Sequence, residues 1–447
     1  MIILNSALPD ITISLYSLIP FILMLGAIAV LPLTAAHFWE KNKNKLIVSC
    51  ILAIPVLIYL INNGLTSSLY HTIFFDYIPF IILLGSLFVI TGGIFVSGDI
   101  VAKPIVNTIF LAIGAVLASF MGTTGAAMLL IRPVIATNKE RKYNVHTILF
   151  FIGIIANCGG LLTPLGDPPL FMLYLRGVPF EWFFNLVPEW LVANGLLLLM
   201  YYLVDSYYYK KEPKENIIID KTNKQPISIS GKLNFLCLAG VILSVAFLNQ
   251  QYLPFITSEG PGKYFGFIRE LAIMSMAVLS LIFTKKNIRT SNKFTWSPII
   301  EVAYLFFGIF ITMVPCILYL ETNAEKLGIQ NTAQFYFYTG ALSGVLDNTP
   351  TALTFYSLAL GLANKFDILF NGIPLVADIP VTLLKAISTS AVFFGSMTYI
   401  GNGPNFMVKA IAEENNIKMP DFFSYIFKFS LIFLLPIFII VYFFFIR

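Results

Sequence analysis

The sequence predicts an all-α polytopic membrane protein made of two inverted-topology repeats, each with five membrane crossings and one re-entrant hairpin. Three observations support this fold class. The 447 residues are 58% hydrophobic and only 11% charged, whereas a soluble protein has about 25% charged residues. Apolar stretches long enough to cross a bilayer as a helix, about 20 residues, recur along the chain. One short phrase rich in helix breakers also occurs twice.

The repeated phrase reads LTPLGDPPLFM at 162–172 and MTYIGNGPNFM at 397–407, with five of eleven positions identical. Both copies interrupt long apolar stretches. Broken backbone at membrane depth must be buried in protein or line a cavity, because lipid cannot satisfy its polar groups. Paired interruptions in matching halves are typical of a transporter's substrate site. The phrase therefore predicts a transporter and not an enzyme.

Apolar segments of suitable length predict ten crossings, two of them broken by the repeated phrase. They are 15–36, 46–61, 78–96, 145–175 (broken), 191–208, 233–248, 267–283, 299–320, 381–411 (broken) and 423–445. Two further apolar stretches, 105–136 and 335–362, carry small and polar residues in their middles. We interpret both as re-entrant hairpins.

The crossings divide the chain into two halves. The first repeat is expected over 1–209, with a hairpin at 105–137 and a broken helix at 145–176. A cytoplasmic linker at 210–232 leads to the second repeat at 233–447, with a hairpin at 333–364 and a broken helix at 379–414. Five crossings in each half is an odd number, so the second half must be inverted relative to the first.

The distribution of basic residues sets the expected orientation. Lys and Arg concentrate in the loops 40–45, 138–142, 210–232 and 285–293, and are nearly missing from 62–77 and 177–190. Basic loops are typically cytoplasmic, which places the N-terminus outside and makes the hairpins enter from opposite sides. The first residues lack the basic region of a cleaved signal peptide. The expected location is a multi-pass position in a bacterial inner membrane.

Two carboxylates lie in the irregular segments. Asp167 is in the first break, and Asp347 is at the tip of the second hairpin. An ionisable group inside a membrane costs at least about 2.5 kcal/mol and is by default a functional candidate. Competition of Na⁺ and H⁺ for one carboxylate is sufficient for antiport. Alternatively, each Asp caps a half-helix by accepting backbone N–H bonds.

The remaining candidates come from the same four segments. Oxygen-rich Thr and Asn side chains suit hard cations such as Na⁺, or could merely satisfy broken-helix backbone. The hypothesis places Na⁺ at Asp347, Asn348 and Asp167, with further ligands from Thr123, Thr124, Thr349, Thr163, Thr398, Asn402 and Asn405. The expected structural breaks are Gly122, Gly166, Gly401 and Gly403 for turn geometry and Pro168 and Pro404 for helix ends.

At these residues the chain resembles the ion transporter superfamily, which includes NhaD-type sodium/proton antiporters, citrate and divalent-anion/sodium symporters, and arsenite pumps. The phrase GDPP at 166–169 is similar to a first-break motif of several branches. The resemblance implies inverted repeats, central hairpins, a dimeric scaffold and elevator-like movement. Divalent-anion symporters carry Ser-Asn-Thr at both tips, where this chain has GTT at 122–124 and DNT at 347–349.

The first expectation is a sodium/proton antiporter with elevator-type alternating access. No cofactor is expected apart from transported or coupling Na⁺ and H⁺. Expected partners are membrane lipid, small ions and a second copy in a homodimer, and nothing indicates nucleic acid. The alternative is sodium- or proton-coupled citrate or dicarboxylate symport, which would add a small organic anion. Asp347 would repel such a substrate, but Asn348 and Thr349 keep the last two positions of the symporter motif.

Two other classes find less support. An aspartyl membrane protease would also need two intramembrane Asp residues, but the phrase before Asp167 is Pro-Leu-Gly and not Gly-x-Gly. The sequence contains no Gly-x-x-x-x-Gly-Lys loop for ATP, which argues against primary pumping by this chain.

Overall fold

The computed structural model describes residues 13–257, 260–365 and 372–447. This part of the chain is mainly helical, and nine of its helical segments are long and apolar enough to cross a membrane. The polytopic all-α prediction is therefore confirmed at this level. Parts of 1–209 and of 233–447 fall outside the described residues, and the inverted relation of the two halves stays a prediction.

In the first half, the described residues form ten α-helices, with short 3₁₀ or π segments labelled η. Pro residues start several of them, as expected where the first N–H groups need no partner. The elements are η1 (Leu15–Leu18), α1 (Ile19–Thr34), α2 (Ala36–Trp39), α3 (Asn42–Asn62), α4 (Thr66–His71), η2 (Thr72–Tyr77), α5 (Ile78–Thr91), β1 (Phe95–Asp99), α6 (Pro104–Met121), α7 (Thr123–Thr137), α8 (Val145–Ile154), η3 (Cys158–Leu162), α9 (Pro168–Leu175), η4 (Phe180–Leu186) and α10 (Val187–Lys210).

The linker and the second half follow the same general pattern of long helices, a helical pair and an interrupted helix. The elements are α11 (Lys214–Thr222), β2 (Gln225–Ser230), α12 (Leu233–Phe247), η5 (Pro261–Gly266), α13 (Phe267–Phe283), α14 (Lys286–Ser291), α15 (Ser297–Asn323), η6 (Ala324–Leu327), α16 (Thr332–Ser343), α17 (Asn348–Lys365), β3 (Leu375–Val376), β4 (Ile379–Pro380), α18 (Val381–Phe394), η7 (Gly395–Met397), α19 (Gly403–Glu414), α20 (Phe422–Tyr425), η8 (Ile426–Leu434), α21 (Leu435–Val441) and η9 (Tyr442–Ile446).

Two expectations about loops were wrong. The third crossing begins at Thr66 and runs without interruption through α4, η2 and α5 to Thr91, although 62–77 was expected as a loop. No Gly or Pro separates Thr66 from Ile78, so nothing stops the helix there. The linker is not a plain polar loop either, because it forms α11 and then β2, which pairs antiparallel with β1.

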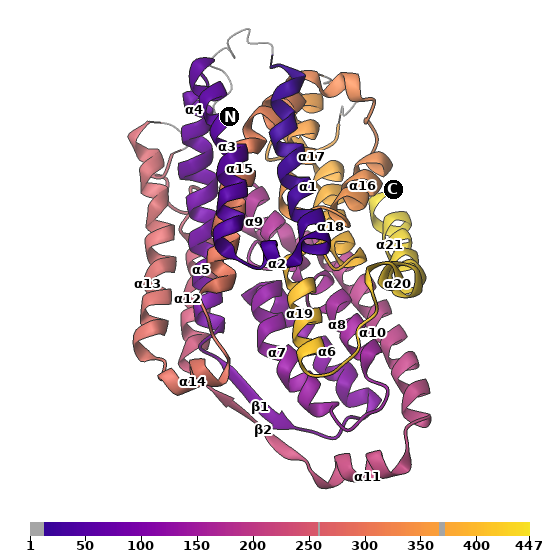
Figure 1. The fold of residues 1–447 in the computed structure, drawn as a ribbon. Helices are drawn as coiled ribbons and strands as arrows, with labels where there is room; N and C mark the ends of the chain where they lie inside the picture. Colours follow the sequence, from indigo (N-terminus) through magenta and orange to yellow (C-terminus); the bar gives the residue numbers. More distant parts are fainter. Residues whose placement is uncertain (1–12, 258–259, 366–371) are drawn as a thin grey trace.

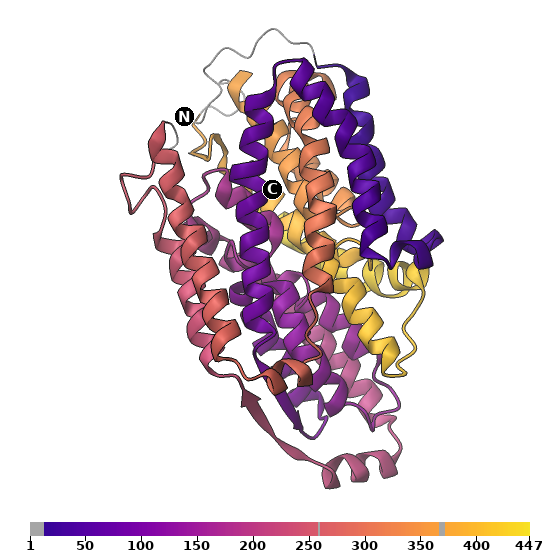
Figure 2. The same cartoon turned by 60° about the vertical axis from the view of Figure 1, so that its left-hand side comes forward.

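The two helical pairs lie at opposite ends of the molecule. Figure 1 shows α6 and α7 in the lower half and α16 and α17 in the upper half, and the turned view of Figure 2 agrees. The sheet of β1 and β2 and the helix α11 lie at the lower end (Figure 1). This arrangement is the one expected for hairpins that enter from opposite sides of a membrane.

The interrupted helices form the centre of the fold. In the segment Val145–Leu162, 83% of the most apolar window is buried, against 22% in the segment Pro261–Phe283. A helix that is apolar all round and buried belongs to a core, whereas an exposed apolar helix in such a chain faces lipid. The first broken phrase is thus enclosed by protein, where its freed polar groups need partners from the chain itself. The second is largely buried, with Gly403 and Phe406 exposed.

Candidate functional site

Hydrogen bonds bring the two hairpin tips and the two breaks together. The backbone N–H of Thr123, at the tip between α6 and α7, donates to the carbonyl of Gly166 in the first break at 2.8 Å. Asn348, at the start of α17, and Asn402, in the second break, both donate to Asp167. The two halves therefore meet at one carboxylate.

Asp167 is at the centre of this arrangement and is 1% exposed. Its Oδ1 accepts from the hydroxyl of Thr123 at 2.7 Å and from Nδ2 of Asn402 at 3.1 Å. Its Oδ2 accepts from Nδ2 of Asn348. None of these donors is a backbone N–H at the start of α9, so the carboxylate does not cap its own helix. The capping alternative does not hold for Asp167.

Asp347 has a different environment. Its Oδ1 accepts the backbone N–H of Thr349 at 3.0 Å, at the start of α17, and its side chain is half-buried. This contact is the helix-capping arrangement that the sequence left open. A carboxylate that caps a helix through one oxygen still has lone pairs for a cation, so Asp347 remains a candidate beside Asp167.

Asn348 carries an unsatisfied acceptor next to Asp167. Its Nδ2 is held by the carboxylate, while its Oδ1 is buried and has no hydrogen-bond partner. A buried acceptor without a donor is costly. A bound cation would satisfy this oxygen and would at the same time bind the carboxylate, so Asp167 and Asn348 form the core of the candidate cation site.

The threonines of the two breaks play matching backbone roles. The hydroxyl of Thr163 donates to the carbonyl of Ser119, at the end of α6. The hydroxyl of Thr398 donates to the carbonyl of Gly344, at the end of α16, at 2.6 Å. Each hydroxyl also accepts N–H groups of its own break. Both hydroxyls thus attach a break to the neighbouring hairpin, and both already donate and accept hydrogen bonds within the protein.

The residues before the two helical restarts share one backbone conformation. Asp167 has φ −143° and ψ 143°, and Asn402 has φ −148° and ψ 141°. Pro168 is the first residue of α9, and Pro404 is the second residue of α19. Proline suits these positions because its fixed φ is helical and its missing N–H is not needed.

Two of the predicted break glycines are required by close backbone approach. A Cβ on Gly166 would lie 2.0 Å from the carbonyl oxygen of Gly160, and one on Gly401 would lie 2.6 Å from that of Gly395. Gly122 instead has a positive φ of 81°, which favours glycine. Gly403 has open space around its Cα, so neither explanation applies to it.

Asn157, which lies between α8 and η3, is a site residue that the repeated phrase did not indicate. Its Nδ2 donates to Oδ1 of Asn405 at 2.7 Å, and its Oδ1 accepts from Asn402 at 3.2 Å. Asn405 in turn donates to the carbonyls of Gly395 and Thr398 at 2.8 and 2.9 Å. A chain of amides therefore leads from Asp167 into the second break. The available signal was a lone Asn within an apolar run just before the Gly pair at 159–160.

The two remaining predicted ligands, Thr349 and Thr124, form no side-chain hydrogen bond to Asp167 among the described residues. Thr349 is buried beside Asp347 and contributes the N–H already described. Thr124 is half-buried at the first tip. Neither side chain is placed against Asp167 by a hydrogen bond among the described residues, so their assignment as ligands stays a prediction.

Four helices begin at this site. They are α7 at Thr123, α9 at Pro168, α17 at Asn348 and α19 at Gly403. A helix N-terminus carries a partial positive charge of about half an elementary charge. Converging N-termini favour a negative group at their centre, which Asp167 supplies. The same field would also suit an anionic substrate.

A second carboxylate cluster lies outside the helical core. Oxygens of Asp99, Glu140 and Asp220 lie within 4.8 Å of one another, at the junction of β1, the loop after α7, and α11. Lys139 places its Nζ 2.6 Å from Asp99, and Asp220 accepts the N–H of Ala102 at 3.1 Å. Burial, followed by the charges of Glu140 and Asp99, raises the pKa of Asp220. This cluster attaches the linker to the first half and is separate from the Asp167 site.

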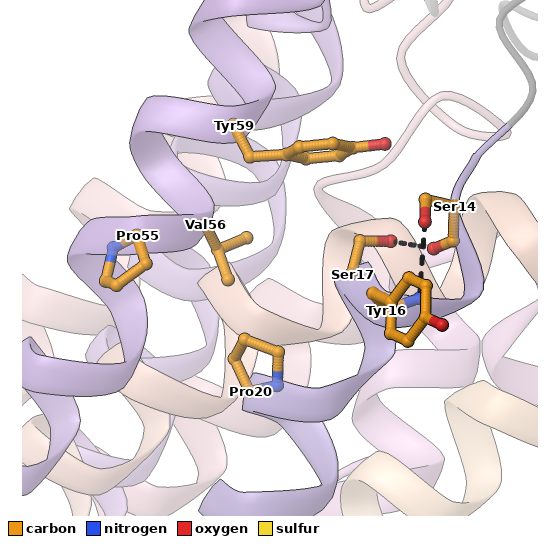
Figure 3. A pocket seen from close by; sticks show the side chains of 7 residues that line it. All are labelled: Ser14, Tyr16, Ser17, Pro20, Pro55, Val56 and Tyr59. Atoms are coloured by element: carbon orange, nitrogen blue, oxygen red, sulfur yellow. Dashed lines mark hydrogen bonds between the residues drawn. The ribbon is translucent and has the colours of Figure 1, made fainter.

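A pocket of about 240 Å³ opens between η1, α1 and α3. Figure 3 shows its side chains, with the hydroxyl of Ser17 donating to the carbonyl of Ser14 at 2.6 Å. The lining contains no acidic or basic side chain and consists of Ser14, Tyr16, Ser17, Pro20, Pro55, Val56 and Tyr59. Its chemistry is therefore unsuited to ion binding.

Comparison with known proteins gives a match to one family model. The model of the CitMHS_2 family, described as "Putative citrate transport", matches residues 10–446. No curated protein matches the chain. The family match covers nearly the whole sequence, including both hairpins, both breaks and all of the candidate site residues. The chain therefore belongs to this family of transporters.

Proposed function

We propose that this protein is a secondary active transporter that exchanges Na⁺ for H⁺. The observation that carries the proposal is the buried Asp167 carboxylate, bound by side chains from both halves of the chain and by no basic residue among those described. A carboxylate in this position binds either a cation or a proton. Because the two ligands compete for the same oxygens, loading one releases the other.

The proposed cation site consists of Asp167 and the free Oδ1 of Asn348, with Asp347 and Thr123 beside them. Carboxylate, amide and hydroxyl oxygens are suitable ligands for a hard cation. When the cation leaves, the three side-chain donors continue to satisfy the carboxylate. Release of the cation therefore does not leave the carboxylate without hydrogen-bond partners in the core. A transport cycle requires such a stable empty site.

We further propose that the hairpins and broken helices move together as one unit, in elevator-type alternating access. Support comes from the contacts that fasten each break to its hairpin and the breaks to one another through Asn157 and Asn402. Such a unit can carry the site between the two membrane faces without dismantling it.

Flux through proteoliposomes tests the function. Purified protein is reconstituted with a pH-sensitive dye inside, and Na⁺, Li⁺, K⁺ and citrate are added in separate experiments across a range of pH. Antiport predicts a cation-dependent rise of internal or external proton concentration, according to the gradient imposed, without any organic anion. Absence of a response to every monovalent cation would refute the proposal.

The second candidate function is sodium- or proton-coupled uptake of citrate or a dicarboxylate. Two observations favour it: the family description and the four helix N-termini that converge on the site, which attract anions. In this case Asp167 would bind the coupling ion. Uptake of labelled citrate that depends on a sodium or proton gradient distinguishes this function, because antiport needs no citrate.

A further inference from the structure

A basic pocket lies far from the breaks, in the turn between α13 and α15. This turn includes α14, and Figure 1 shows it at the lower ends of α12 and α13, on the side of β1 and β2. The pocket has a volume of about 390 Å³ and is lined by Lys286, Arg289, Thr290, Lys293, Phe294 and Thr295. Three cations and two hydroxyls thus face one space, and no carboxylate is part of the lining.

The positive charge of the pocket is not offset by the protein. Among the residues that the structure describes, neither Lys286 nor Lys293 forms an ion pair, and both are exposed. The Nη atoms of Arg289 donate hydrogen bonds to neutral groups, namely the carbonyl of Val89 at 2.7 Å and the hydroxyl of Ser280 at 2.9 Å. Its Nε is buried and has no partner.

The pocket is rigidly attached to the helices above it. Asn292 donates to the carbonyls of Gly92 and Ile94 at 3.2 and 2.9 Å, which ties the turn to the end of α5. The Arg289 guanidinium lies 5.2 Å from the centroid of the Phe294 ring, and that ring packs against Phe88 at 5.2 Å. The cationic side of the pocket is therefore preformed.

Lys293 has an unusual backbone for its residue type. Its φ is 51°, in the left-handed region that side chains with a Cβ disfavour. The N–H of Phe294 bonds to the carbonyl of Arg289, and the N–H of Lys293 bonds to that of Thr290, which closes α14 in the manner that normally uses glycine. Lys293 therefore adopts a conformation that costs free energy for its residue type.

The surroundings place the pocket at a membrane–water boundary. Ile282 and Phe283, at the end of α13, are 68% and 61% exposed, and Trp296, just after the pocket, is 49% exposed. Exposed apolar side chains at the end of an apolar helix face lipid, and Trp is typical of the interface. A pocket with three cations at this level lies beside the phosphate groups of the lipids.

We propose that this pocket binds the phosphate of an anionic phospholipid headgroup, on the membrane face that carries the basic loops. Lys286 and Lys293 supply ammonium donors, Arg289 adds a fixed positive charge behind them, and Thr290 and Thr295 supply hydroxyl donors. Basic pockets between membrane helices are known to suit such headgroups.

The test uses the purified full-length chain in an uncharged detergent. Binding of phosphatidylglycerol, phosphatidylcholine and inorganic phosphate is measured by native mass spectrometry, together with the midpoint of thermal unfolding. The variant is Lys286→Gln with Lys293→Gln, at two exposed positions. The matched control is Lys41→Gln with Lys43→Gln, which removes the same charge from two other exposed lysines on the same predicted face.

Wild-type protein is expected to bind phosphatidylglycerol in preference to phosphatidylcholine. The pocket variant should weaken this binding roughly 25-fold, about fivefold for each lysine, while the control retains it. Equal losses in both variants would show a general surface effect and overturn the proposal. Equal binding of the two lipids would also overturn it, as would binding of inorganic phosphate with the same affinity as the lipid.

Discussion

Replacement of Asp167 by Asn removes one charge from the proposed site and leaves its shape nearly unchanged. The new side chain keeps one oxygen, which can accept from Thr123 and Asn402 as Oδ1 does now. Its NH₂ group would face the amide of Asn348, whose own oxygen has no partner. Rotation of that amide by half a turn restores the third hydrogen bond.

The consequences for folding and for ion binding therefore differ. We expect the free energy of unfolding to change by less than about 1 kcal/mol, because every hydrogen bond is remade. A cation about 4 Å from the carboxylate gains about 4 kcal/mol at an effective dielectric constant of 20. Loss of that term weakens cation binding by roughly three orders of magnitude, since about 1.4 kcal/mol corresponds to a factor of ten.

The assay measures the sodium concentration that gives a half-maximal proton response in proteoliposomes, together with the unfolding midpoint in detergent. Asp421→Asn serves as a control, because this Asp lies at the start of α20, makes none of the hydrogen bonds to Asp167, and Asn can keep the cap. Asp167→Asn protein that is folded and exchanges Na⁺ for H⁺ with wild-type affinity would show that the reasoning is wrong.

Three further predictions concern stability and are measured by unfolding of the purified protein in detergent. Gly166→Ala should destabilise the first break by at least about 1–3 kcal/mol, because the added Cβ would lie 2.0 Å from a carbonyl oxygen. Asp205→Asn should cost about 1.5–3 kcal/mol, because Arg141, 3% exposed and 2.6 Å from Asp205, would lose one of its two carboxylate partners and keep only Glu212 at 3.6 Å. Asp421→Ala should destabilise the start of α20 at neutral pH, because hydrogen bonds from Ser424 lower the pKa of Asp421. This contribution is present above the unfolded value of about 3.9 and is lost as the pH falls through the lower folded pKa.

Each of these predictions has its own comparison. Gly403→Ala, where the structure has open space, should leave stability unchanged, and an equal loss would show that the contact is not the cause. For Asp205, the comparison is Glu413→Gln, which removes the carboxylate of a more exposed ion pair with Lys409. This variant should lower the free energy of unfolding by under about 0.5 kcal/mol, and an equal loss in both variants would show that burial of the ion pair is not the cause. For Asp421, a gap between wild type and variant that stays constant down to the lowest pH would contradict the assigned cause.

The sequence was a good guide to where helices begin, end and break. The repeated phrase contains enough Gly and Pro to exclude a continuous helix at 162–169 and at 397–404, and the structure interrupts both segments there. The error at 62–77 has a clear origin. The segment lies between two predicted crossings and was expected as a loop, but without a helix breaker the chain continues its helical hydrogen bonds.

The partners of Asp167 were less accessible to such reasoning. Asp167 and Asp347 have the same residue type and a similar setting in sequence, yet one receives three side-chain donors and the other caps a helix. The difference depends on how two distant halves pack. Asn157 belongs to neither copy of the phrase, and in the register of the phrase its counterpart is Val392, so no repeat comparison could have found it.

The pairing of β1 with β2 holds the start of the first hairpin close to the linker. Asp99 ends the strand and Pro104 begins α6, only five positions later. A fully extended chain spans at most about 18 Å over that interval. As long as the two strands stay paired, the start of α6 cannot move farther than this distance from the end of β1. In the proposed elevator-type motion, the connection would therefore limit the displacement of α6 relative to the strands. Insertion of residues between Asp99 and Pro104 would test this limit.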